Sequence, residues 1–202
     1  VGDMAKLVYG VGDKGTKYSC KDGNTLSKEY NAWRSLLYRC NPKYWENLSC
    51  YAGVTCTDNF KSFTFFYEWC QQQKGFGNID DNGKSWHLDK DILVKGNKVY
   101  SEDTCVFVPQ KINSLVIVKA SKRGEYPLGV SLNKISNKYV AHCNNGTGVK
   151  KNLGCFDTPE EAFICYKTYK ESVVKTAAEK YRDDIDERLY QALLDYKVEI
   201  TD

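Results

Sequence analysis

The most uneven feature of this sequence is a run of basic side chains between residues 111 and 156. This stretch holds eight lysines or arginines and one acid, Glu125, a local balance of +7 in a chain whose formal net charge is +3. The basic residues are Lys111, Lys119, Lys122, Arg123, Lys134, Lys138, Lys150 and Lys151. A run of charges more commonly marks a solvated face. However, the helix expected after this stretch carries acids and bases alike, so the excess of positive charge is confined to the stretch itself. We therefore favour a nucleic-acid partner, whose phosphates such a surface attracts.

A second set of reactive side chains alternates along a short segment. His87, Asp89 and Asp91 lie within 86–94, which we expect to form a strand. Alternate residues of a strand point to the same face, so an imidazole and two carboxylates would lie together. The plainer alternative is a half-buried histidine and two solvated acids beside Lys90.

Nine cysteines are a high count for 202 residues. The number is odd and 1–11 shows no secretory signal, so we expect reduced thiols in the cytoplasm rather than disulfides. None of the nine forms a C-x-x-C pair, which argues against zinc and favours cysteines as small core residues. The zinc set considered was Cys40, Cys50, Cys56 and Cys70. No apolar run approaches the roughly 20 residues of a membrane span, so no membrane partner is expected.

The N-terminal half is expected to be mainly helical. Apolar residues in 26–40 recur at helical spacing, which predicts an amphipathic helix. Six aromatic residues in 60–69 predict a second short helix that ends before Lys74. Their rings could stack on bases, but such stripes usually face the core, which we favour.

Turn residues divide the remainder of the chain. The segment 86–94 should turn at 95–98 and return as a hairpin strand at 99–100, and Ser101 should cap a short helical turn through Thr104. Three further strands are predicted at 128–133, 138–143 and 151–156. Thr158, Pro159 and Glu161 then have the spacing of a capping box at a helix start. A last amphipathic stretch, 181–194, completes the chain.

The second half resembles the Apetala-2 DNA-binding domain. The resemblance is carried by 123–131, by 138–142 and by 153–162, where the ending LGCFDTPEEA is the most specific part. It implies a three-stranded antiparallel sheet backed by one helix, with the exposed sheet face in the major groove of double-stranded DNA. The positions that match the family's DNA-contacting residues are Lys122, Arg123, Ser131, Asn133, Lys134, Lys138, His142, Lys150, Lys151 and Asn152. In such a face, Arg and Lys pair with guanine or hold phosphates, and Asn pairs with adenine. Leu132 and Val140 stand where the family often has arginine or tryptophan, so the base sequence that it reads does not carry over.

A part of the first half resembles the HNH endonuclease core of phage homing-type proteins. The matching stretches are 87–92, 96–97 and 99–108. The resemblance implies hydrolysis of DNA phosphodiesters with a divalent metal, Mg²⁺ or Mn²⁺, in a strand-strand-helix frame. His87 would be the general base, Asp89 the main metal ligand and Asp91 a second ligand. Thr104 stands where the pattern has a metal-binding Asn, and Lys90 where it has His, so activity is expected to be weak or lost.

These observations predict an α+β fold in two units. An HNH-like unit of N-terminal helices and a strand-strand-helix frame would occupy 1–110, followed by a connector at 111–124. The DNA-binding sheet, its helix and a helical extension would occupy 125–202. Three functions remain open: a phage endonuclease acting in the host cytoplasm, a DNA-binding regulator descended from one, and an RNA-binding protein that uses the same basic sheet.

Overall fold

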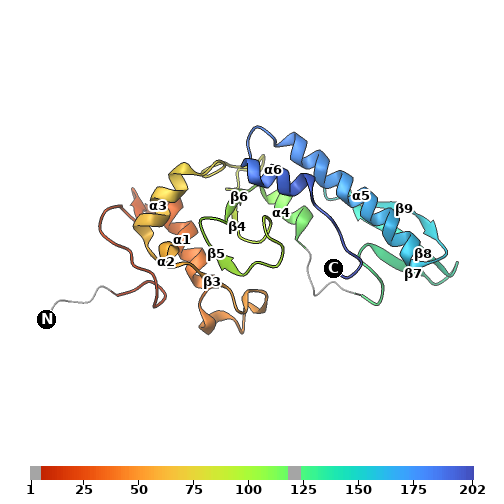
Figure 1. Ribbon diagram of the computed structural model, residues 1–202, viewed down its shortest axis with the longest axis horizontal. Coiled ribbons are helices and arrows are strands. Elements are labelled where there is room, and N and C mark those ends of the chain that lie inside the picture. Colours follow the sequence, from red (N-terminus) through yellow and green to blue (C-terminus); the bar gives the residue numbers. More distant parts are fainter. Residues whose placement is uncertain (1–5, 118–123) are drawn as a thin grey trace. The chain divides into compact units, whose positions relative to one another are not determined.

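The computed structural model of the chain describes residues 6–117 and 124–202 (Figure 1). Its fold is α+β, as predicted. The chain divides into two compact units, Val1–Pro109 and Gln110–Asp202. Among the described residues, no helix has both the length and the apolar character to cross a membrane.

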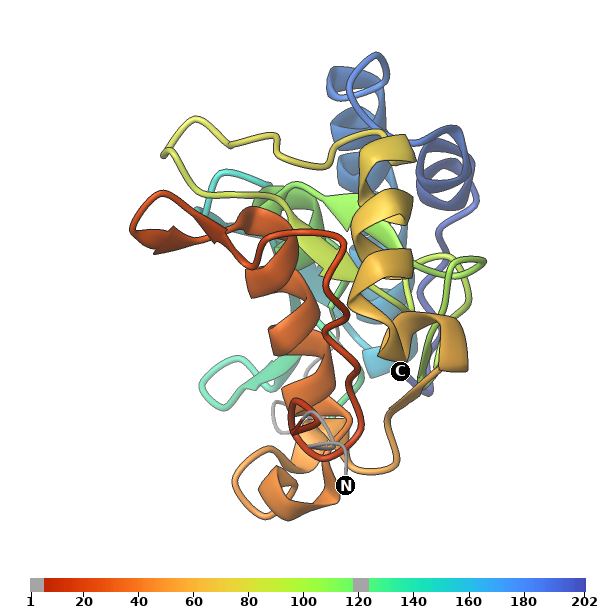
Figure 2. The same ribbon diagram turned by 90° about the vertical axis from the view of Figure 1, so that its left-hand side faces the viewer.

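The first unit is built around three helices. The predicted amphipathic helix is α1, Lys28–Arg39, and Ser27 caps it by accepting a hydrogen bond from the backbone N–H of Tyr30. The other elements of this part are the strands β1 (Lys21–Asp22), β2 (Thr25–Leu26) and β3 (Thr55–Cys56), the 3-10 turns η1 (Pro42–Tyr44) and η2 (Ser49–Tyr51), and the helices α2 (Asp58–Lys61) and α3 (Phe63–Gln72). Helices α1 and α3 pack against each other (Figure 2).

The aromatic cluster fills the space between these helices. Phe60, Phe63 and Phe66 are fully buried, and so is Trp33 of α1. The Trp33 indole donates to the carbonyl of Phe60 at 2.8 Å, and the rings of Phe60 and Trp69 lie 4.9 Å apart. The expectation that this stripe is core is confirmed.

The strand pairing after the aromatic core differs from the prediction. Strand β4, His87–Asp89, pairs antiparallel with β6, Val106–Val108, whereas β5, Val99–Tyr100, pairs in parallel with β3. The predicted hairpin between 86–94 and 99–100 is therefore wrong. The strand ends early because the Asp89 carboxylate accepts hydrogen bonds from the backbone N–H groups of Asp91 and Ile92, which turns the chain away.

The predicted connector begins with a helix. Helix α4, Gln110–Val116, follows β6 after one residue and belongs to the second unit. Ile112 and Leu115 are buried, and α4 packs on helix α5 of the same unit. The apolar side chains of 112–116 recur at helical spacing. The prediction of a connector did not take this spacing, and the burial that it implies, into account.

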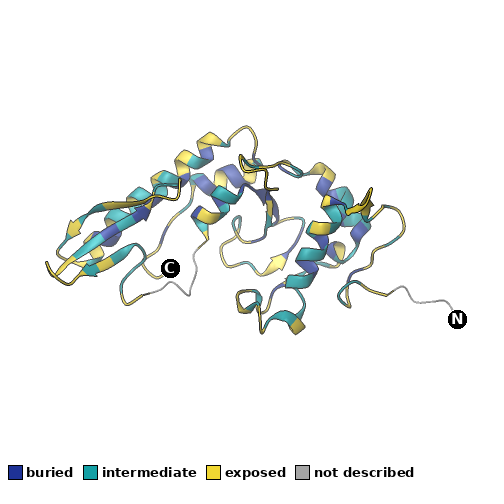
Figure 3. Cartoon of the chain, turned by 180° about the vertical axis from the view of Figure 1, so that it is seen from behind, coloured by how far each residue is buried: buried dark blue, intermediate teal, exposed yellow. Residues whose placement is uncertain are grey.

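The second unit contains the predicted sheet. Strands β7 (Val130–Asn133), β8 (Lys138–Asn144) and β9 (Lys150–Phe156) form an antiparallel sheet in the order β7-β8-β9. Helix α5, Pro159–Lys180, lies along one face of it, with the predicted capping box between Thr158 and Glu161 at its start. The buried strand residues of this sheet are Ala141 and Cys143, which alternate along β8 and so share the face that α5 covers. Figure 3 shows the burial of the chain by colour.

The close approach of α5 depends on a glycine beside β7. Gly129 has φ +72°, and a Cβ atom there would lie 2.1 Å from the ring of Tyr166 on α5. Helix α6, Glu187–Leu194, capped by Asp186, then packs on α5 through its buried face, which includes Leu189 and Leu193. The helical extension is thus part of the unit's core, and the face of the sheet opposite α5 is left open.

Candidate nucleic-acid interface

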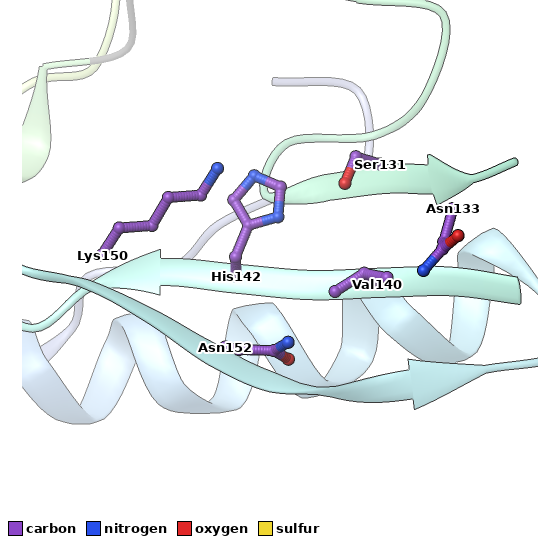
Figure 4. A pocket seen from close by; sticks show the side chains of 6 residues that line it. All are labelled: Ser131, Asn133, Val140, His142, Lys150 and Asn152. Carbon is purple, nitrogen blue, oxygen red and sulfur yellow. The ribbon is translucent and has the colours of Figure 1, made fainter. Parts of the chain in front are cut away.

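The strand register determines which side chains point away from α5. Ser131 of β7 pairs with Val140 of β8, and His142 of β8 pairs with Asn152 of β9. Cross-strand partners point to the same face of a sheet, so these four residues share the open face. An open depression on this face is lined by Ser131, Asn133, Val140, His142, Lys150 and Asn152 (Figure 4). Five of these six are residues that the sequence predicted as DNA contacts, and Val140 is the sixth.

A β-bulge determines which side chains of β9 point to the open face of the sheet. The register shifts between Ala141 and His142, so that Ala141 pairs with Gly154 and His142 pairs with Asn152. The Asn152 side-chain oxygen accepts the backbone N–H of Gly154 at 3.0 Å, and Gly154 has φ +140°. The bulge therefore reverses the alternation of β9 and turns Lys150 and Asn152 onto the open face.

The turn between β7 and β8 is braced by Asn133. Its side-chain oxygen accepts the backbone N–H groups of Ile135 at 3.0 Å and Ser136 at 3.3 Å. Such a turn is typical of asparagine. It holds Asn133 at the edge of the open face and leaves Lys134 exposed at the turn.

His142 lies near the centre of the open face. Partial burial lowers its pKa, and the nearby charge of Lys150 lowers it further. A hydrogen bond to the backbone of Val140 opposes these two effects. At neutral pH the ring is therefore uncharged, with its N–H engaged by Val140 and its other nitrogen an acceptor.

Three predicted DNA contacts are placed differently or lie outside the described residues. Lys151 pairs with Cys143 on the helix side of the sheet, where its ammonium lies 5.1 Å from the ring centre of Tyr169 on α5. The sequence interpretation treated Lys150 and Lys151 alike, because the bulge that separates their faces was not recognised. Lys122 and Arg123 lie outside the described residues.

Lys138 is on the open face but already has an acidic partner. It pairs with Asn133 in the register, and its ammonium forms an ion pair with Asp157, just before α5. In contrast, Lys150 forms no ion pair within 6–117 and 124–202. Lys150 is thus the cation of this depression whose charge is least compensated.

The second candidate site lies at the end of β4. His87 and Asp89 are on one face of the strand, and Asp91 lies beyond the strand end. Burial raises the pKa of Asp89, and the neighbouring carboxylate of Asp91 raises it further. Burial and the charge of Arg39 lower the pKa of His87, so its ring is uncharged at neutral pH.

Lys90 stands in this site where the nuclease pattern has histidine. It is only 8% exposed, its ammonium lies 3.2 Å from the Asp91 carboxylate, and it lies 5.8 Å from the ring centre of Tyr100. Arg39, on helix α1, donates a hydrogen bond of 3.0 Å to the hydroxyl of the same Tyr100. A fixed cation therefore sits beside the carboxylate pair.

Thr104, the predicted third metal ligand, is engaged elsewhere. Its hydroxyl is bonded to Ser101, to the carbonyl of Val99 and to the amide of Asn97. The segment 102–104 is a single turn that Ser101 caps as predicted, since its hydroxyl accepts the backbone N–H of Thr104 and its carbonyl accepts that of Cys105. Thr104 thus belongs to a network that closes the loop, and among the described residues its hydroxyl has no hydrogen bond to Asp89 or Asp91.

Asn97 is the residue that the sequence interpretation missed here. Its amide donates to the carbonyl of Lys90 at 2.6 Å and to that of Val99 at 2.8 Å, and so ties the two ends of the loop together. The sequence places it in a turn and in the stretch 96–97 that matches the HNH pattern, but assigns it no role in the site. The signal available in the sequence was its place inside a long loop between strands, where buried carbonyls need donors.

No protein-family model, curated protein or solved structure matches this chain.

The chemical abilities of the two sites therefore follow from their side chains alone. Within the described parts of the chain, no group of three or more His, Cys, Asp or Glu side chains is arranged to hold a metal ion. A cation at the end of β4 would have to rely on the Asp89 and Asp91 pair. The open face of the sheet offers hydrogen-bond donors, one uncharged imidazole and an uncompensated lysine, and these suit phosphates and base edges.

Proposed function

We propose that this chain binds double-stranded DNA through the open face of β7, β8 and β9. The observation that carries the proposal is the set of polar side chains gathered there, namely Ser131, Asn133, His142, Lys150 and Asn152. The sequence from 126 to 156 contains no Asp or Glu, so no carboxylate of this sheet would repel phosphate. The major groove of B-DNA is wide enough to admit β-strands.

The proposed contacts differ in what they contribute. Lys150 supplies a charge for a phosphate or a guanine edge, and exposed Lys134 supplies another at the turn. Ser131 offers both a donor and an acceptor, and uncharged His142 offers its acceptor nitrogen. Val140, in the middle of the depression, offers an apolar surface of the kind that contacts a thymine methyl group.

Two adjacent lysines provide the test of this face. Lys150→Ala should weaken binding severalfold and reduce the slope of log Kd against log salt by about 1, because one phosphate contact is lost. Lys151→Ala removes the same charge one residue away, on the helix side, and should change both quantities much less. Fluorescence anisotropy with a labelled random-sequence duplex, over a series of salt concentrations, measures both.

The other outcomes are equally definite. Equal losses for Lys150→Ala and Lys151→Ala would assign the affinity to overall charge rather than to the open face. Absence of binding to any duplex would end the proposal. Tighter binding to an RNA duplex of the same sequence would make RNA the partner instead.

A separate observation favours a second function at the end of β4. The carboxylates of Asp89 and Asp91 are near each other, and the pKa of Asp89 is raised first by burial and then by repulsion from Asp91. A divalent cation, Mg²⁺ or Mn²⁺, relieves such repulsion, and oxygen ligands suit it. We propose that Asp89 and Asp91 would hold it and that uncharged His87 would take a proton from the attacking water during phosphodiester cleavage. The ion would supply charge stabilisation at the phosphate.

The donor set fits this role only in part, because Lys90 already compensates Asp91. The test is nicking of supercoiled plasmid with Mg²⁺ or Mn²⁺, with and without a chelator. Asp89→Asn should abolish nicking, since its amide oxygen can still accept from Asp91 and Ile92 while the ligand charge is gone. If the wild-type chain binds DNA but does not nick with either metal, the function is that of a DNA-binding regulator. In that case Lys90→His is the variant expected to restore trace cleavage.

A further inference from the structure

The side-chain amide of Asn133 has a fixed orientation. Both groups that its oxygen contacts, the backbone N–H of Ile135 and that of Ser136, are donors, so the atom facing them must be the oxygen. These two bonds occupy both acceptor positions of that oxygen. The amide nitrogen forms no hydrogen bond with any described residue, and in Figure 4 it is turned toward Val140.

Asn152 repeats this arrangement on β9. Its oxygen accepts the backbone N–H of Gly154 at 3.0 Å and so is directed to the bulge. Its nitrogen likewise has no acceptor among the described residues. Both asparagines line the depression from opposite edge strands, on either side of Val140 and His142 (Figure 4).

The depression therefore presents mainly donors to an incoming base. Lys150 is a donor only, and the carboxylate of Asp157, which follows β9, is paired with Lys138. Adenine in the major groove shows one donor and one acceptor, N6 and N7, and the usual Asn pairing uses both atoms of the amide. Guanine shows two acceptors, O6 and N7, and thymine shows one acceptor, O4, next to its methyl group.

We infer that this face selects the keto groups of guanine (O6) and thymine (O4), through the amide N–H groups of Asn133 and Asn152 placed around Val140, over the N6 amino group of adenine, which would meet these donors with a donor of its own. The inference rests on the proposed DNA binding and names the base class that it recognises. It replaces the expectation that these asparagines pair with adenine. To accept from adenine N6, Asn133 would have to release a backbone N–H of its own turn.

Exchange of Asn133 for aspartate tests the inference directly. In Asn133→Asp, one carboxylate oxygen can still accept from Ile135 and Ser136, so the turn is kept, while the outward group changes from donor to acceptor. Duplexes selected from a random pool should then change at one position, from guanine or thymine to cytosine or adenine, whose amino groups are donors.

Asn137→Asp is the matched control. Asn137 is exposed in the same turn with φ +52°, a conformation that aspartate also tolerates. The Asn137→Asp variant adds the same negative charge as Asn133→Asp, so it should lower the affinity for DNA through repulsion without changing the selected bases. If Asn133→Asp selects the same bases as wild type, or if wild type selects adenine at the position that Asn133→Asp alters, the inference is overturned.

The wild-type chain gives an independent answer if Asn133→Asp binds too weakly for selection. In the duplex that wild type selects, 6-thioguanine or 4-thiothymine should reduce affinity at the contacted positions, because sulfur is a weaker acceptor than the keto oxygen that it replaces. N6-methyladenine should have no effect at any position. A loss with N6-methyladenine alone would overturn the inference, whereas failure of wild type to bind any pool would overturn the proposed function instead.

Discussion

Asn97 in the loop after β4 and Asn133 in the turn after β7 both brace a turn by accepting a backbone N–H with the side-chain oxygen, but only Asn97 also uses its amide nitrogen. Asn97 donates its amide hydrogens to the carbonyls of Lys90 and Val99. Asn133 accepts with its oxygen and keeps its donors outside. The lysines differ in the same way, since Lys90 is buried and paired with Asp91 whereas Lys150 is exposed.

A surface that binds another molecule and a loop that is bonded to itself therefore differ in where their hydrogen-bond donors are directed. On the sheet, the internal bonds of the turn and bulge leave donor groups directed outward. In the loop after β4, the donors of Asn97 and Lys90 are used by the loop itself. The sheet therefore has free donors with which to bind a second molecule. In the loop, the groups available for a ligand or for catalysis are the carboxylates and His87.

The largest expected effect concerns His87, because a variant of this residue tests whether the loop takes part in catalysis. If nicking is observed, His87→Ala should slow it by about 10²- to 10⁴-fold, the usual contribution of a general base. The wild-type rate should be constant near neutral pH and fall as pH drops through the lowered pKa of His87, because protonation removes the base. Nicking assays over a pH series measure this.

DNA affinity provides the control for this variant. The sheet lies in the other unit, so His87→Ala should bind duplex DNA as wild type does. An unchanged nicking rate in His87→Ala would exclude the general-base role and leave the loop with at most a metal-binding one.

Asn97 and Asn133 should also differ in their contributions to stability. Asn97→Ala removes donors from two carbonyls, and each lost bond costs about 1 kcal/mol, so we expect a loss of about 2 kcal/mol in the free energy of unfolding. Asn133→Ala affects an exposed turn and should cost less than about 1 kcal/mol. Urea denaturation of both variants measures the difference, and equal losses would contradict the contrast drawn between the two turns.

Local signals predicted much of the fold. The capping box at Thr158, the helical spacing in α1 and the alternating middle strand β8 all have short-range causes, and each was found where the sequence placed it. The pairing of β4 with β6 is different, because 89 and 106 are joined through a long loop whose path depends on Asn97. Short strands with no alternation of their own do not specify their partners.

The candidate site was predictable to the same extent. Five lining residues of the depression were named from the family resemblance, but the opposite facing of Lys150 and Lys151 depends on the bulge at His142. A bulge adds one residue to a strand and leaves the composition unchanged, so alternation alone cannot reveal it. Likewise, the direction of the Asn133 amide depends on backbone groups of the turn, and those follow only from the folded chain.

A titration of DNA affinity would sharpen the description of the open face. The pKa of His142 is lowered by burial and by Lys150, so the ring is uncharged at neutral pH and gains a charge only in more acidic solution. Affinity for a duplex should therefore rise severalfold as pH falls through this lowered pKa, because a new cation faces the phosphates. His142→Gln should remove the pH dependence while keeping a donor and an acceptor. A pH profile that is identical in His142→Gln would place the titrating group elsewhere.

The same lowered pKa predicts an opposite trend for stability in the absence of DNA. The unfolded chain takes up a proton on His142 at higher pH than the folded chain does, so the stabilisation is present above the unfolded pKa and is lost as pH falls. His142→Gln should lose less stability on acidification than wild type. Urea denaturation at neutral and acidic pH measures this, and equal losses would contradict it.

The smallest expected effect concerns Asp157, whose carboxylate compensates Lys138. Both side chains are largely exposed, so their ion pair should contribute little to stability, and removing the acid should free Lys138 for a phosphate. Asp157→Asn should therefore bind duplex DNA more tightly than wild type and show a steeper salt dependence, whereas Lys138→Ala should weaken binding less than Lys150→Ala does. The capping box remains intact in Asp157→Asn, since Thr158 and Glu161 form it. Anisotropy titrations of the three variants order these effects. If Asp157→Asn binds as wild type does, Lys138 is not within reach of the DNA, and the contacted surface is confined to the depression around Val140.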